Sequence, residues 1–87
     1  MPKLTQAAGE MLTQMLRDNQ ATEGQCIRLC ADGSQLKMVI AEEQPEDTTL
    51  AHDDKVVLAL EPMVAGQLEE ATFDVKQTEE GKLLVVT

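Results

Sequence analysis

The sequence is poor in aromatic and basic residues, and each shortage excludes a class of function. Phe73 is the only aromatic residue, so the chain lacks the stacking platforms that proteins use to bind single-stranded nucleic acid. Seven Lys and Arg residues stand against sixteen Asp and Glu residues, which gives a formal net charge of −9. A chain with this charge repels phosphate backbones, and we therefore exclude nucleic acid as a direct ligand.

Long apolar runs are also missing. No stretch approaches the roughly 20 apolar residues of a transmembrane helix, and the N-terminus has no run of signal-peptide character. We therefore expect a cytoplasmic protein with no membrane partner. A length of 87 residues predicts a single domain over residues 1–87, and a hydrophobic content of 43% is enough for a small aliphatic core.

The residues that usually carry metal or redox chemistry are few. Cys26 and Cys30 lie four positions apart on one predicted strand, so their Cα atoms are about 13 Å apart, whereas a disulfide needs roughly 4.4–6.8 Å. On a regular strand they cannot pair or chelate one metal together. His52 is the only histidine, and it precedes Asp53 and Asp54 at a predicted turn, where consecutive residues do not converge on one ion.

These residues leave only weak candidates for a site. Cys26 and Cys30 are the candidates for cofactor binding, and His52 is the candidate for metal binding. The sequence contains no nucleophile–base pair and no Gly-rich phosphate loop, so we expect no enzymatic activity and no catalytic residue.

The stretch from Gln25 to Ala41 predicts a β-hairpin around which the chain is organised. Its arms are 26–30 and 36–40, and its turn is 31–34, where Asp32-Gly33 tolerates the positive φ of tight turns. Ile27 and Leu29 share one face of the first arm, and the second arm alternates Leu36, Met38 and Ile40 with other residues. We expect an apolar face of this hairpin to receive a helix.

That helix is predicted over residues 5–18, with Thr5 as the N-cap. Its apolar stripe has the i, i+3, i+4 spacing, and Gly9 permits a close backbone approach. The stripe consists of Ala8, Met11, Leu12, Met15 and Leu16. The remaining pattern predicts a solvated acidic loop at 42–47, strands at 48–52, 55–60, 71–76 and 82–86, a short helix at 62–68 and a polar turn at 77–81.

Several of these features occur together in one known family. The order of Leu4-Thr5-Gln6-Ala7-Ala8, Ile27-Arg28-Leu29, the acidic loop, Glu61-Pro62 and Phe73-Asp74-Val75 resembles that of the A-type iron–sulfur carriers, the HesB/IscA-like family. The resemblance implies a mostly β (α+β), compact domain of mixed sheets with a packed N-terminal helix and one short helix. It also implies protein partners in iron–sulfur assembly or sulfur metabolism, and a tendency to form homodimers.

The chain departs from this family where the family binds iron. The family uses three cysteines, one in a Cys-Ser-Gly-Phe turn and two in a Cys-Gly-Cys tail. Here Gly33-Ser34-Gln35-Leu36 matches the turn, so Gly33 occupies the ligand position, and the sequence reaches Thr87 without such a tail. Cys26 and Cys30 do not align with the family ligands. Soft thiolates are the ligands that iron–sulfur clusters require.

Three functional hypotheses follow. We expect a degenerate HesB/IscA-like protein that acts by protein–protein contact and carries no cofactor. The first alternative is an atypical iron or iron–sulfur carrier in which Cys30 is joined by Cys26, His52 or a second subunit. The other alternative is a small acidic binding module that is unrelated to iron–sulfur assembly.

Overall fold

The computed structural model describes residues 2–87 and consists mostly of strands. In chain order the elements are β1 (Lys3–Leu4), α1 (Gln6–Asp18), β2 (Gln25–Asp32), β3 (Gln35–Glu42), β4 (Thr48–His52), β5 (Lys55–Leu60), α2 (Pro62–Gln67), β6 (Thr72–Thr78) and β7 (Gly81–Val86). None of the helices within residues 2–87 has the length and apolarity needed to cross a membrane.

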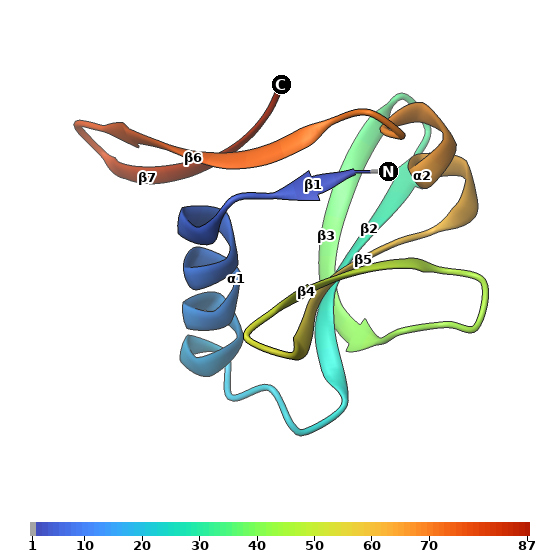
Figure 1. Cartoon of the computed structure of the whole chain (residues 1–87), viewed down its shortest axis with the longest axis horizontal. Coiled ribbons are helices and arrows are strands. Elements are labelled where there is room, and N and C mark those ends of the chain that lie inside the picture. The colour runs from blue at the N-terminus through green and yellow to red at the C-terminus, as the bar shows by residue number, and fades with distance from the viewer. Residues whose placement is uncertain (1) are drawn as a thin grey trace.

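The strands form two sheets (Figure 1). The larger sheet has the order β3-β2-β5-β4, and the smaller has the order β1-β6-β7. The β2–β5 and β1–β6 pairs are parallel, and the other neighbouring strands are antiparallel. The two sheets and two helices confirm the predicted fold class, which is mostly β (α+β) with mixed sheets.

The start of α1 links the helix to the smaller sheet. The Oγ1 of Thr5 accepts a hydrogen bond from the backbone N–H of Ala8 at 3.1 Å, as an N-cap does. The same hydroxyl donates to Oδ1 of Asp74 on β6 at 2.9 Å. One threonine therefore satisfies a free N–H at the helix terminus and fixes the helix against β6.

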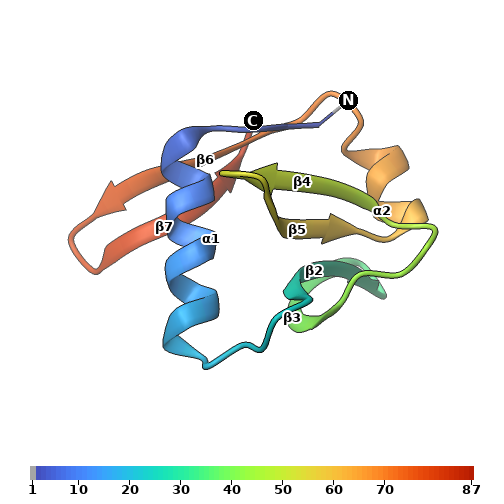
Figure 2. The same cartoon turned by 60° about the horizontal axis from the view of Figure 1, so that its bottom comes forward.

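The predicted stripe of α1 is the face that the helix buries. Ala8, Leu12 and Leu16 are buried, whereas Met11 and Met15 are half-buried at its margin. The helix packs on β4, β5 and β6, and it lies along one side of the molecule, with the β6–β7 hairpin across one end (Figures 1 and 2).

The most apolar strand, β5, lies inside the larger sheet between β2 and β4. Val57, Leu58, Ala59 and Leu60 are fully buried, which confirms the prediction that both faces of this strand are covered. Full burial of each large aliphatic side chain contributes roughly 1.5–3 kcal/mol. The single aromatic residue, Phe73, is also fully buried in this core.

The hairpin forms as predicted but with longer arms and a shorter turn. Asp32 pairs with Gln35, so the loop consists of Gly33 and Ser34 alone, and Gly33 has a φ of +66°. The expectation that a helix covers the hairpin's apolar face is wrong for the second arm, β3. β3 is an edge strand, and Leu36 and Met38 remain 47% and 44% exposed.

Two further boundaries differ from the sequence prediction. Strand β6 continues to Thr78, and β7 begins at Gly81, so the predicted turn at 77–81 contracts to residues 79–80. The short strand β1 was not predicted, because its two residues are defined only by pairing with Thr72 and Phe73.

Candidate functional site

The tip of the β2–β3 hairpin is the position where the family resemblance calls for a thiolate ligand. Gly33 occupies it, in the left-handed backbone region that glycine adopts without strain. The space around it is open, because within residues 2–87 no atom outside its chain neighbours lies within 4 Å of where a Cβ would stand. The flanking residues at this exposed tip are Asp32, Ser34 and Gln35, so the tip offers oxygen and amide groups and no sulfur.

The two cysteines lie on β2 and are both free thiols. Cys26 is only 2% exposed. Burial raises the pKa of the Cys26 thiol, and the nearby carboxylates of Glu43 and Asp47 raise it further, against a smaller opposing effect of Arg28. Cys26 is therefore a protonated core side chain at neutral pH and not a ready metal ligand.

Cys30 is half-buried, and its Sγ accepts a long hydrogen bond of 3.7 Å from Nη1 of Arg28. Because β2 is a regular strand from Gln25 to Asp32, the spacing argument against a joint Cys26–Cys30 site holds in the structure.

An ion pair between Arg28 and Asp47 organises this face of β2. Nε and Nη2 of Arg28 donate to the two carboxylate oxygens of Asp47 at 2.7 and 2.8 Å, a bidentate arrangement. The Arg28 side chain is 18% exposed, and that of Asp47 is completely covered. Hydrogen bonding to Arg28 lowers the pKa of Asp47, with help from the backbone N–H of Gln44.

The composition of the acidic loop predicts that all of its side chains are solvated, and this prediction is wrong for Asp47. Residues Glu42, Glu43 and Glu46 are exposed, but Asp47 folds back to neutralise Arg28. The two partners are nineteen residues apart, and no local pattern pairs them. Beside them, a carboxylate oxygen of Glu61 accepts a hydrogen bond from the backbone N–H of Ala31, and this fixes the end of β2 near α2.

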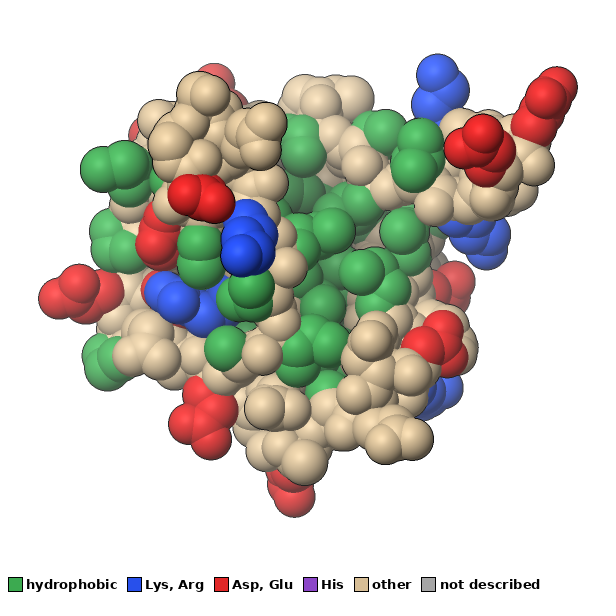
Figure 3. Space-filling model, turned by 180° about the vertical axis from the view of Figure 1, so that it is seen from behind, with side chains coloured by type: hydrophobic (Ala, Val, Ile, Leu, Met, Phe, Trp, Pro, Cys, Tyr) green, Lys and Arg blue, Asp and Glu red, His purple; other side chains and the backbone are tan. Residues whose placement is uncertain are grey.

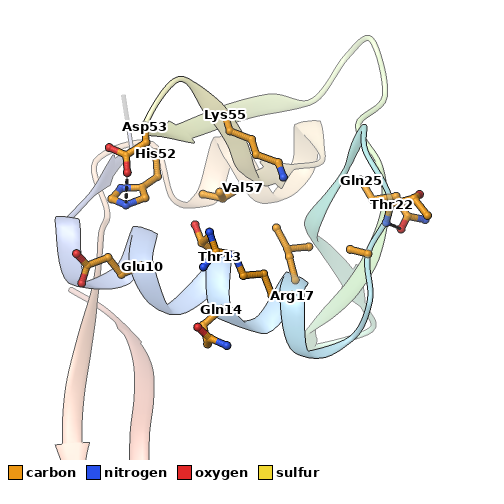
Figure 4. Close-up of a pocket in the computed structure, with 12 residues that line it drawn as sticks. Glu10, Thr13, Gln14, Arg17, Thr22, Gln25, His52, Asp53, Lys55 and Val57 are labelled. Carbon is orange, nitrogen blue, oxygen red and sulfur yellow. Dashed lines mark hydrogen bonds and ion pairs between the residues drawn. The ribbon is translucent and has the colours of Figure 1, made fainter.

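His52 lies elsewhere, at the end of β4, against α1. Its ring packs directly on Gly9, where a Cβ would come within 2.3 Å of Nδ1. Its Nε2 lies 3.4 Å from Oδ2 of Asp53, whose φ of +52° belongs to the tight β4–β5 turn. Figure 4 shows His52 and Asp53 at one end of an open pocket of about 510 Å³ between α1 and the β4–β5 hairpin.

The structure does not bring the candidate residues together. Cys26 and Cys30 belong to β2, His52 belongs to β4, and β5 separates these two strands. Among residues 2–87, no three His, Cys, Asp or Glu side chains are grouped so that they could hold a metal ion. The donor set described here does not fit an iron–sulfur cluster, because the hairpin tip has no thiolate and the nearest cysteine is half-buried beside an arginine.

Comparison with solved structures identifies the fold. The crystal structure of IscA with the [2Fe-2S] cluster matches with a TM-score of 0.66 and 19% sequence identity, over 100% of this chain and 84% of that chain. The crystal structure of Escherichia coli SufA, involved in biosynthesis of iron–sulfur clusters, matches with a TM-score of 0.73 and 16% identity, over 99% of this chain and 83% of that chain. Neither protein-family models nor curated protein sequences gave a match. The structural neighbours thus confirm the predicted fold.

Proposed function

We propose that this chain is a member of the A-type iron–sulfur carrier family that has lost the carrier chemistry and acts in iron–sulfur biogenesis through protein contact. The fold shared with IscA and SufA over essentially the whole chain supports the family assignment, as do the sequence elements that resemble the family in the same order.

The observation that carries the functional part is the chemistry of the hairpin tip. Gly33 stands at the position of the family's turn cysteine, and its surroundings are open enough to accept a side chain. The open space alone would admit a side chain, but the φ of +66° would strain a cysteine at this position, so the turn suits glycine and not a thiolate ligand. A cluster needs several thiolates within one coordination sphere, and Cys26, with its raised pKa, and Cys30 do not form such a set.

The proposed function is tested by measuring direct binding to iron–sulfur assembly proteins. The purified chain and a variant with Cys26→Ala and Cys30→Ser are titrated against scaffold and sulfur-donor proteins by calorimetry. Alanine is chosen at position 26 because a serine hydroxyl would be buried in the core. We expect saturable binding that is equal for the two forms. Binding that disappears with the thiols would favour the carrier alternative, and no binding by either form would favour the unrelated acidic module.

A further inference from the structure

The most unusual surface of the described chain is the open edge of β3. This strand borders β2 on one side and no strand on the other. Its Leu36 and Met38 share one face of the strand and are 47% and 44% exposed. Seen from behind, the molecule also has hydrophobic side chains gathered in a hollow across its middle (Figure 3), so exposed apolar surface is not confined to this edge.

The backbone of this edge is also free to pair. Asp32 and Gln35 flank a two-residue turn, so they form a hydrogen-bonded pair of the hairpin. Alternation along the strand then directs the N–H and C=O groups of Leu36, Met38 and Ile40 away from β2. An exposed edge with apolar side chains is the template to which another extended segment adds as a strand.

The other three edge strands differ from β3, and one of them, β1, is only two residues long. Strand β4 carries a register shift between Leu50 and Ala51, a feature that disrupts further pairing. Strand β7 exposes Leu83 and Val86, but these lie an odd number of positions apart and therefore on opposite faces. Among the edge strands within residues 2–87, only β3 combines a regular ladder with two exposed apolar side chains on one face.

The charge on and around β3 determines which segment would fit. Asp32 lies at one end of the edge, Glu42 and Glu43 lie at the other, and all three are exposed. Lys37 is the only basic residue on the strand. The whole chain carries a net charge of −9, so a second copy would bring the same charge against this edge. A basic segment is attracted instead.

We infer that the β3 edge binds an extended segment of another protein that alternates apolar and basic residues and pairs with the backbone of Leu36, Met38 and Ile40. This inference rests on the proposed function and names the surface and the chemistry of the protein contact. The apolar residues of the segment would contact Leu36 and Met38, and its basic residues would lie near the acidic ends.

The test uses the full chain labelled with ¹⁵N and a capped synthetic peptide in which lysine and valine alternate. At a free peptide concentration of ten times Kd, amide exchange at Leu36, Met38 and Ile40 should slow about tenfold, because exchange proceeds from the unbound fraction. The amides of Lys37 and Val39, which point toward β2, should change little. A glutamate–valine peptide of the same length should not bind under these conditions.

Matched variants separate edge pairing from general attraction. Met38→Lys should weaken lysine–valine peptide binding about tenfold, whereas Leu83→Lys, with the same charge change at the edge of the other sheet, should change it less than about twofold. Met38→Pro removes an outward N–H while leaving the β2 ladder intact, and it should also abolish protection. Equal binding of both peptides, equal effects of the two lysine variants, or unchanged binding to Met38→Pro would overturn the inference.

Two further readouts keep this inference distinct from the proposed function. A doubled molar mass in light scattering, with the same three amides protected before peptide is added, would assign the edge to a second copy and overturn the inference. If the peptide leaves the edge unprotected while assembly proteins still bind, the inference fails and the proposed function stands. A chain that carries a cluster would contradict the proposed function whatever the edge binds.

Discussion

Gly9→Ala should destabilise the protein although alanine is the better helix former. Gly9 lies inside α1, and the ring of His52 occupies the space where a side chain would stand. A Cβ at this position would lie 2.3 Å from Nδ1, 2.5 Å from Cγ and 2.9 Å from Cβ of His52. The last contact involves the root of the histidine side chain, so no rotation about χ1 removes it.

The expected magnitude is the difference between two opposing effects. Replacing glycine by alanine inside a helix is worth about 1 kcal/mol of added stability. Forcing extra volume into a packed contact costs roughly 1–3 kcal/mol, and the upper end applies because the His52 side chain is only 14% exposed. The net loss is therefore about 2 kcal/mol, which lowers Tm by roughly 8–16 °C in a domain of this size.

Urea and thermal unfolding followed by circular dichroism measure this change. His52→Ala removes the two closest atoms and keeps only the Cβ contact of 2.9 Å, so Gly9→Ala should cost less in that background than in the wild type, and the double-mutant cycle should show coupling. Gly66→Ala in α2 is the control, because nothing lies within 4 Å of its Cβ position, and this variant should be neutral or slightly stabilising. A Gly9→Ala protein as stable as the wild type, or no relief by His52→Ala, would refute the proposed packing.

Three other predictions follow from the described contacts. Thr5→Ala removes the helix cap and should lower the free energy of unfolding by about 1 kcal/mol. Thr5→Ser keeps a capping hydroxyl and should retain most of the wild-type stability. Asp47→Asn leaves Arg28 without its carboxylate and should cost about 3 kcal/mol at pH 7 in urea unfolding. Because the pKa of Asp47 is lowered in the folded state, this stabilisation is fully present above about pH 4 and is lost as pH falls toward the folded pKa. The free energy of unfolding of Asp47→Asn should therefore fall less steeply on acidification than that of the wild type. In thiol titration with an aromatic disulfide, Cys30 should react in the native protein while Cys26 reacts only after unfolding, and two equally fast thiols would contradict the burial of Cys26.

Much of the fold could be predicted from the sequence because its cues are local. The apolar run at β5 fixes a strand with the predicted bounds, and Thr5 before an apolar stripe marks the helix start. Strand β1 has no such cue, because it exists only through pairing with β6, nearly seventy residues away. The exposure of Leu36 and Met38 is equally non-local, since their alternation is the same whether or not another element covers them.

The candidate site divides in the same way. The spacing of Cys26 and Cys30 on one predicted strand argues against a shared ligand set, and the structure places both residues on the regular strand β2. The Arg28–Asp47 ion pair could not be predicted from the sequence, because it forms only when the acidic loop folds back on β2. The composition of that loop predicts only solvated side chains. Gly9 predicted a close backbone approach, and the group that lies against it is the side chain of His52. Only the packing of α1 on the β4–β5 hairpin identifies that neighbour.

Anaerobic reconstitution with iron and sulfide tests the central claim most directly. The wild-type chain and the Cys26→Ala, Cys30→Ser variant are reconstituted side by side, desalted, and measured for iron, acid-labile sulfide and visible absorption. The donor set described here predicts a colourless wild type that retains no more iron or sulfide than the variant. A brown wild-type protein with stoichiometric iron and sulfide, both lost in a folded variant, would contradict the claim and establish the chain as a cluster carrier.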